Sequence, residues 1–178
     1  MKSKEKRYLN DLAGRLAIAL LLPLKSFSLF YLVFTPLTIY FTYFFLNLFY
    51  SVQLDGSVIY VGEKAIEIIR PCVAGSAYYL LAVLNLATKG LDVAKRIKLF
   101  IFTSAALLAV NLLRIFVLTV VLVSYGTFTF TSLHLGFWLV GSTLFVVGIW
   151  IAAVRIYEIK DIPFYSDLRE VMKFIKKS

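Results

Sequence analysis

An uninterrupted apolar run from Phe27 to Tyr50 constrains this chain more than any other feature. Its 24 residues include no charged side chain and many Phe and Tyr residues. A helix of about 20 apolar residues can cross the hydrocarbon core of a bilayer. The whole chain is 61% hydrophobic and 16% charged, which is outside the ordinary range of soluble domains. We therefore predict an all-α, polytopic membrane bundle of about four to six transmembrane helices.

Further apolar segments of spanning length follow the first one. Two connections separate them: a basic loop at 89–98 and the uncharged loop GTFTFTS at 126–132. A shorter apolar stretch, Leu16–Leu24, is closed by Pro23 and Lys25 and has too few residues to cross a bilayer. The N-terminal region 1–26 is therefore predicted to be a basic tail followed by an interfacial or re-entrant helix. The later predicted spans are Cys72–Thr88, Leu99–Tyr125 and Leu133–Val154.

The segment between the first two spans has a different pattern. Two short runs rich in β-branched residues, 57–61 and 65–69, flank a turn at Gly62. This pattern predicts a short β-hairpin outside the membrane. At the other end, residues 156–178 form a basic tail in which Leu168, Val171, Met172 and Ile175 fit one apolar helix face.

The basic residues predict the orientation of the spans. Of the 19 Lys and Arg residues, six lie in the first 25 positions, four in the 89–98 loop and six from Arg155 onwards. Cytoplasmic loops of membrane proteins carry an excess of Lys and Arg. Four spans with both termini in the cytoplasm put all of these charges on one side. The sequence therefore predicts a multi-pass cell-membrane protein, and the basic loops need no nucleic-acid partner to explain them.

Cys72 is the only cysteine of the chain, so it cannot form an intrachain disulfide. Pro71 precedes it, and Pro is favoured at the first position of a helix. We expect Cys72 in a first helical turn, where the helix dipole and the nearby Arg70 favour a thiolate. The alternative is an inert cysteine that packs as a small apolar side chain.

Two other residues are predicted to share the depth of Cys72 in the membrane. Arg114 lies about 24 Å along its helix from Lys98, in the outer half of the bilayer. His134, the only histidine, begins the last span at the same surface. A buried arginine in a span usually marks a functional site, although structural pairing with Asn111 would also account for it. Equally, His134 could be an ordinary interfacial residue.

Together these residues fit acyl transfer, with Cys72 as nucleophile, His134 as base and Arg114 as oxyanion stabiliser. Asp55, Glu63 and Glu67 are candidates to orient His134, and the spacing selects none of them. One Cys and one His do not complete a zinc site, and no nucleotide-binding motif is present, so we expect no metal or cofactor. Around the site, helical spacing predicts a supporting set of polar residues: Ser76, Tyr79 and Asn111.

The order of these motifs resembles the exosortase/archaeosortase family. The matching elements are C-x-x-G-S at 72–76, N-x-x-R-I at 111–115 and the histidine that opens the next span. The run around Cys72 looks most like the short archaeal branch, the pacearchaeosortases. The resemblance covers roughly residues 27–155, which it implies are a membrane-embedded catalytic domain.

The resemblance implies a cysteine protease and transpeptidase with its active site facing outside. Its substrates would be surface proteins that end in a recognition motif, a transmembrane helix and a basic tail. The new C-terminus would pass to an acceptor, in some cases a membrane lipid. Two other functions stay open: a non-catalytic scaffold or anion carrier built around Arg114, and a thiol-dependent lipid acyltransferase.

Overall fold

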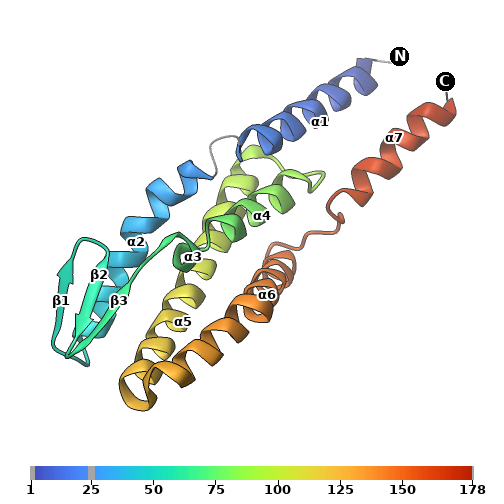
Figure 1. The fold of residues 1–178 in the computed structure, drawn as a ribbon. Coiled ribbons are helices and arrows are strands. Elements are labelled where there is room, and N and C mark those ends of the chain that lie inside the picture. Colours follow the sequence, from blue (N-terminus) through green and yellow to red (C-terminus); the bar gives the residue numbers. More distant parts are fainter. Residues whose placement is uncertain (1–2, 24–26, 178) are drawn as a thin grey trace.

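The computed structural model describes residues 3–23 and 27–177, and the fold is mostly helical with one small sheet (Figure 1). The sheet and the two chain ends lie at opposite ends of an elongated bundle. In chain order the elements are α1 (Ser3–Leu21), α2 (Ser28–Asn47), β1 (Val52–Asp55), β2 (Val58–Val61), β3 (Lys64–Glu67), α3 (Arg70–Val73), α4 (Gly75–Leu86), α5 (Val93–Gly136), the π-helical segment η1 (Phe137–Gly141), α6 (Ser142–Ile156) and α7 (Tyr165–Lys177).

Within the described residues, two helical stretches are long and apolar enough to cross a membrane: α2 and the stretch Val93–Ile156. The second stretch folds back on itself at Gly126, whose φ of 80° breaks the helix, and α6 then returns alongside α5 (Figure 1). The predicted loop 126–132 is therefore wrong, because residues after Gly126 are already helical. The predicted basic loop 89–98 is also shorter than expected, since α5 begins at Val93.

The predicted second span, Cys72–Thr88, is not one helix. Its first turn is α3, and Ala74 follows with φ of 59° and ψ of 42°, a left-handed conformation that separates α3 from α4. The 12 residues of α4 are fewer than a bilayer crossing needs. Gly75 follows the break and packs against α2, where a β-carbon would lie 2.7 Å from the Tyr31 ring.

The extracytoplasmic hairpin that we predicted is instead a three-stranded antiparallel sheet in the order β1-β2-β3. The predicted pairing of β2 with β3 is present, with Val61 opposite Lys64. β1 was missed, although Gly56 begins a two-residue connection like that of Gly62, a position that favours glycine.

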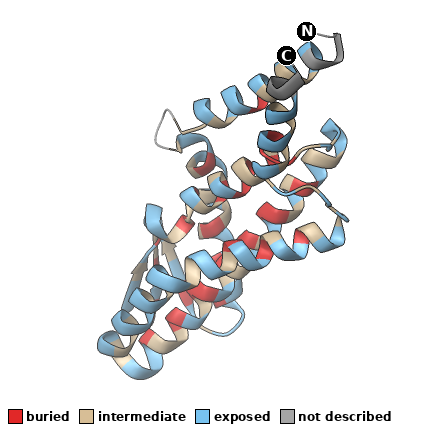
Figure 2. Ribbon diagram, turned by 90° about the vertical axis from the view of Figure 1, so that its right-hand side faces the viewer, coloured by how far each residue is buried: buried red, intermediate tan, exposed pale blue. Residues whose placement is uncertain are grey.

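Two clusters of buried residues form the core, one among the helices and one between the helices and the sheet. Buried residues are red on the ribbon of Figure 2. The first joins α2, α4, α5 and α6, and the rings of Phe34 and Tyr78 stack in it with centroids 3.6 Å apart. The second lies between the sheet and the helices and includes Ile59, Val73 and Ile115. The second cluster packs the segment that carries Cys72 between the sheet and α5.

The N-terminal region is a single helix rather than a tail followed by a short helix. α1 runs from Ser3 to Leu21 through a sequence rich in good helix formers. Residues 24–26, where the predicted interfacial segment ends, lie outside the described residues. The amphipathic helix expected near the C-terminus is confirmed as α7.

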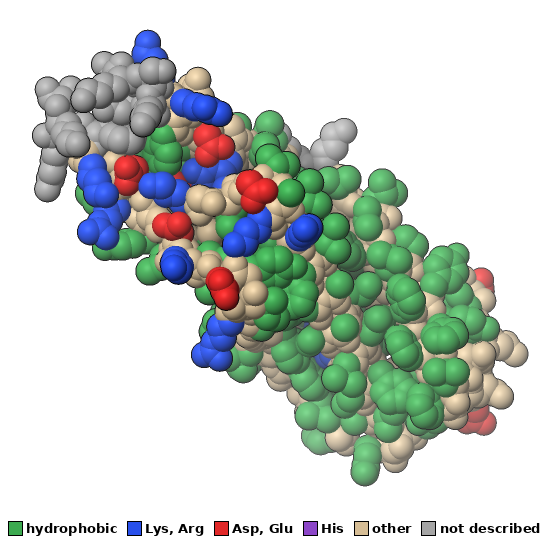
Figure 3. All heavy atoms as spheres, turned by 180° about the vertical axis from the view of Figure 1, so that it is seen from behind, with side chains coloured by type: hydrophobic (Ala, Val, Ile, Leu, Met, Phe, Trp, Pro, Cys, Tyr) green, Lys and Arg blue, Asp and Glu red, His purple; other side chains and the backbone are tan. Residues whose placement is uncertain are grey.

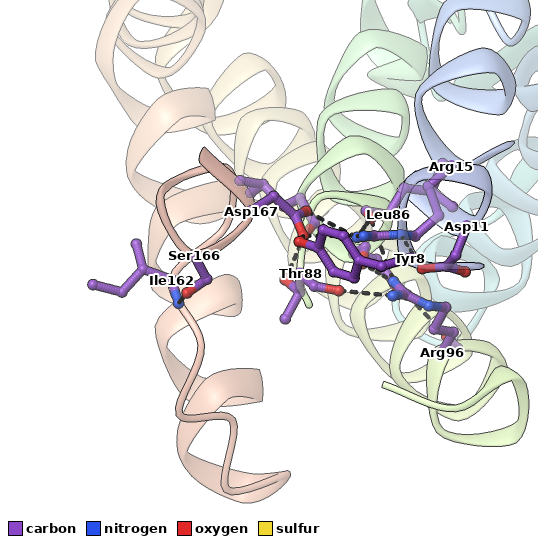
Figure 4. Close-up of polar contacts among 11 residues, drawn as sticks. Tyr8, Asp11, Arg15, Leu86, Thr88, Arg96, Ile162, Ser166 and Asp167 are labelled. Carbon is purple, nitrogen blue, oxygen red and sulfur yellow. Dashed lines mark hydrogen bonds and ion pairs between the residues drawn. The ribbon is translucent and has the colours of Figure 1, made fainter. Parts of the chain in front are cut away.

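α7 is held against α1 by a buried network at the end of the molecule that carries both termini (Figure 4). Arg15 donates two hydrogen bonds to the carboxylate of Asp167, at 3.0 and 3.1 Å, and Tyr8 donates a third to the same carboxylate. Arg96 donates to the carbonyls of Asn85 and Leu86 at the end of α4 and to that of Thr88 just after it, at 2.7 Å. We call Tyr8, Arg15, Arg96 and Asp167 the terminal clamp.

Candidate functional site

A cavity of about 410 Å³ opens between β3, α3 and α5. Its walls include the three residues that the sequence predicts to act together, although they are far apart in the chain. The complete lining is Lys64, Ala65, Ile66, Glu67, Ile68, Ile69, Cys72, Arg114, Ile115, Leu118, Thr119, Leu122, Thr127, Phe130 and His134. We call this space the cysteine cavity.

Cys72 reaches the cavity from the short α3 turn. Its backbone N–H donates to the carbonyl of Ile69 at 2.8 Å, so this amide is not free to stabilise a thiolate. A four-residue turn also has little macrodipole, and the left-handed Ala74 disconnects it from α4. The expected support of the thiolate by a helix N-terminus is therefore wrong. The Arg70 guanidinium lies over the Tyr31 ring, 5.5 Å from its centroid.

Two side chains of α5 hold the Cys72 backbone in place. The Asn111 amide donates to the Cys72 carbonyl at 2.7 Å, and Nη2 of Arg114 donates to the same oxygen at 3.3 Å. Asn111 and Arg114 thus share an acceptor, and in the described residues they are not hydrogen-bonded to each other. Their shared partner is a backbone carbonyl, which fixes the α3 turn against α5.

Arg114 keeps most of its hydrogen-bonding capacity. Its side chain is buried, with 7% of the residue exposed, and Nε has no hydrogen-bond partner in the described part of the chain. A guanidinium carries five N–H donors, and a buried donor without a partner is costly. Arg114 also lies within electrostatic range of both Cys72 and His134. Arg114 can therefore donate hydrogen bonds to an oxygen atom of a ligand at the cavity wall.

His134 is half-buried and lies in the helix that follows Gly126, not at the start of a span as expected. Its ring stacks on Phe130 with centroids 5.5 Å apart. Glu67 is the only one of the three candidate carboxylates in the cavity lining, whereas Asp55 and Glu63 are not part of it. None of these carboxylates is hydrogen-bonded to the imidazole in residues 27–177.

None of the three predicted supporting residues lines the cavity. The break at Ala74 turns the face of α4 away from Cys72, so the helical spacing that we used does not apply. Ser76 is exposed, and the Tyr79 hydroxyl donates to the Ala19 carbonyl of α1 at 3.2 Å. Asn111 alone of this set is hydrogen-bonded to Cys72, at its backbone carbonyl.

The contribution of β3 to the cavity was not predicted from the sequence. All four of its residues line the cavity, as do Thr119 and Thr127 from the helices. One signal was available: only four residues separate Glu67 from Cys72, so the strand had to lie near the thiol. Among the described residues, no cluster of three or more His, Cys, Asp or Glu side chains could hold a metal ion.

No protein-family model matches this chain, and no curated protein or solved structure is significantly similar to it. The function proposed for this chain therefore depends on the chemistry of the cysteine cavity and on the sequence motifs that line it.

Proposed function

We propose that this protein is a membrane-embedded cysteine peptidase and transpeptidase. The observation that carries the proposal is one cavity lined by the sole cysteine, the sole histidine and a buried arginine, Cys72, His134 and Arg114. A thiolate is a good nucleophile, and a neutral imidazole can accept its proton. The guanidinium can stabilise the oxyanion that develops during acyl transfer.

In the proposed reaction, His134 takes the proton of the Cys72 thiol as the sulfur attacks a peptide carbonyl carbon. The carbon–nitrogen bond breaks, a thioester forms, and the imidazolium gives the proton to the leaving amine. A second nucleophile then attacks the thioester and restores the thiol, with its proton passing through His134. The unpaired N–H of Arg114 supports an oxyanion role, since this donor gains a partner when the negative oxygen forms.

We propose that the chain crosses the membrane four times with both termini in the cytoplasm. The crossings would be α2, α3 with α4, α5 up to Gly126, and the returning stretch through α6. Charged side chains gather near the chain ends while the rest of the visible surface is largely apolar (Figure 3). This distribution supports a cytoplasmic position for the terminal clamp and an outer position for the sheet.

The substrate that we propose follows from the resemblance to archaeosortases. It is a surface protein with a C-terminal recognition motif, a transmembrane helix and a basic tail, cut on the outer side of the membrane. The acceptor of the new C-terminus would be a second nucleophile such as a membrane lipid. An outer cavity suits a cleavage point just outside a transmembrane helix.

The test is co-expression with a surface protein that carries such a tail. Cys72→Ala and Cys72→Ser should abolish processing, as seen by a mass shift of the substrate, while membrane insertion is retained. Ser76→Ala is the matched control, because Ser76 is exposed and outside the cavity. Unchanged processing by Cys72→Ala would exclude the peptidase.

The unpaired Nε of Arg114 also favours a second candidate, an anion-binding carrier or scaffold without catalysis. That function predicts a thiol whose alkylation rate at neutral pH does not change in His134→Ala. A thiol-dependent lipid acyltransferase would instead accumulate an acyl-lipid adduct on Cys72. The intact mass of the trapped protein separates a peptide adduct from a lipid adduct.

A further inference from the structure

β3 is an edge strand that faces the cysteine cavity. It pairs with β2 on one side, and in residues 27–177 no strand pairs with its other side. All four residues of β3 line the cavity, and the lining continues through Ile68 and Ile69 to Cys72. An unpaired edge presents a row of backbone donors and acceptors that can pair with another chain.

The alternation of hydrogen-bonded pairs between β2 and β3 shows which backbone groups of β3 are free. Ile68 N–H donates to the carbonyl of Ser57 at 2.9 Å, and hydrogen-bonded pairs alternate along an antiparallel ladder. Ile66, paired opposite Ile59, therefore directs its backbone towards β2. Ala65 and Glu67 lie at the intervening positions, so their N–H and C=O groups point away from β2.

We propose that the cysteine cavity binds its peptide substrate as an extended strand that pairs with β3. This inference rests on the proposed peptidase function and adds the way in which the substrate is recognised. The occupant is the segment just before the scissile bond, because the free edge leads directly to Cys72. Backbone pairing gives affinity with few demands on side chains, as in other cases of strand addition.

The direction of the segment follows from the direction of β3. The strand runs from Lys64 towards Cys72, and in the proposed topology it runs from the outer surface towards the membrane. A substrate whose transmembrane helix follows the cut enters the membrane in the same direction. Its extended segment would therefore lie parallel to β3, with its last carbonyl near Cys72 and Arg114.

The experiment measures labelling of Cys72 by two reagents in the full-length protein in detergent. One is iodoacetamide, and the other is an acetylated hexapeptide of alternating Val and Thr that ends in a chloromethyl ketone. In both cases the sulfur forms a bond to carbon, the halide leaves and the thiol proton passes to the buffer. Since Cys72 is the only cysteine, the intact mass reports its labelling, and Cys72→Ala gives the background.

Two changes remove the edge pairing. Ala65→Pro deletes one outward N–H and leaves the bonds to β2, whereas Ala65→Ser keeps the N–H and serves as the control. On the wild-type protein, two peptides N-methylated at opposite alternating sets of nitrogens provide a test that does not depend on a variant. Only one of these sets can face β3.

We expect the unmodified peptide to label wild-type protein and Ala65→Ser about 2- to 10-fold faster than Ala65→Pro, because the variant loses one backbone hydrogen bond of ordinary net strength. One N-methylated peptide should lose this advantage and the other keep it. Iodoacetamide labelling should be equal in all three proteins. Iodoacetamide labelling that is as fast in His134→Ala as in the wild-type protein would instead count against the peptidase function.

Equal peptide labelling of Ala65→Pro and wild type, or equal labelling by the two N-methylated peptides, would overturn strand addition. A detergent-solubilised dimer that Ala65→Pro dissociates would also overturn it, since the edge would then pair with a second copy. Light scattering of the purified protein distinguishes this outcome.

Discussion

An arginine is buried towards each end of the molecule, and the two differ in how many hydrogen bonds they make. Arg15 is 6% exposed and has every part of its guanidinium bound, to Asp11, Asp167 and the Leu86 carbonyl. Arg114 is 7% exposed, yet it has one long hydrogen bond and an Nε without a partner. Burial alone therefore does not distinguish the two arginines. They differ in how many of their N–H donors have a partner.

The chemistry around the terminal clamp is consistent with a structural role. Burial and the hydrogen bond to Asp167 raise the pKa of Tyr8 well above its ordinary value, so its hydroxyl stays a donor at physiological pH. Asp167 thus has two donors, Tyr8 and Arg15, and its charge is balanced. Among the residues that the structure describes, none of the clamp side chains has a buried nitrogen or oxygen atom without a hydrogen-bond partner.

The largest loss of stability is expected at Arg15, whose guanidinium is fully hydrogen-bonded. Arg15→Met should lower the free energy of unfolding by about 3–5 kcal/mol, because it leaves Asp167 buried without its counter-ion. Chemical unfolding in detergent micelles measures the change. Asp11→Asn is the control: that side chain is 64% exposed, and its loss should cost less than about 1 kcal/mol. An Arg15→Met protein as stable as wild type would show that the clamp does not hold α7.

A smaller effect is expected beside the cysteine cavity. Gly75→Ala puts a methyl group 2.7 Å from the Tyr31 ring and should destabilise the protein by about 1–3 kcal/mol. Gly148→Ala in α6 meets no atom within 4 Å and should be neutral or stabilising. Thermal unfolding of the two variants compares them directly. A neutral Gly75→Ala would mean that the ring moves aside at no cost.

The smallest effect on stability is expected at Arg114. Arg114→Met removes one long hydrogen bond but also relieves a buried, largely unpaired charge, so the unfolding free energy should change by less than about 1 kcal/mol. Substrate processing should nevertheless be lost. A destabilisation as large as that of Arg15→Met would reduce Arg114 to a structural residue.

The sequence predicted those parts of the fold that depend on local composition. The charge-free run from Phe27 gave α2, and the long apolar stretch from Leu99 gave most of α5. The helical rise per residue also brought Arg114 to the level of Cys72, because α5 is regular between Val93 and Tyr125.

Other features depend on tertiary packing and could not be predicted in this way. Ala74 adopts a left-handed conformation that its residue type disfavours, and the close packing of Gly75 against Tyr31 comes directly after it. Positions counted along a continuous helix, such as Ser76 and Tyr79, were therefore wrong. β1 was missed because Gln53 and Asp55 give it little strand character.

Gly126 reverses the chain at a single residue, with no flexible connection on either side. The angular setting of His134 around its helix is consequently determined by counting residues from that glycine. One residue inserted just after it would turn the imidazole by about 100° and move it out of the wall that it shares with the sulfur. The number of residues between Gly126 and His134 thus sets the direction of the imidazole. Insertions or deletions at this helical hairpin should be far less tolerated than in an ordinary surface loop.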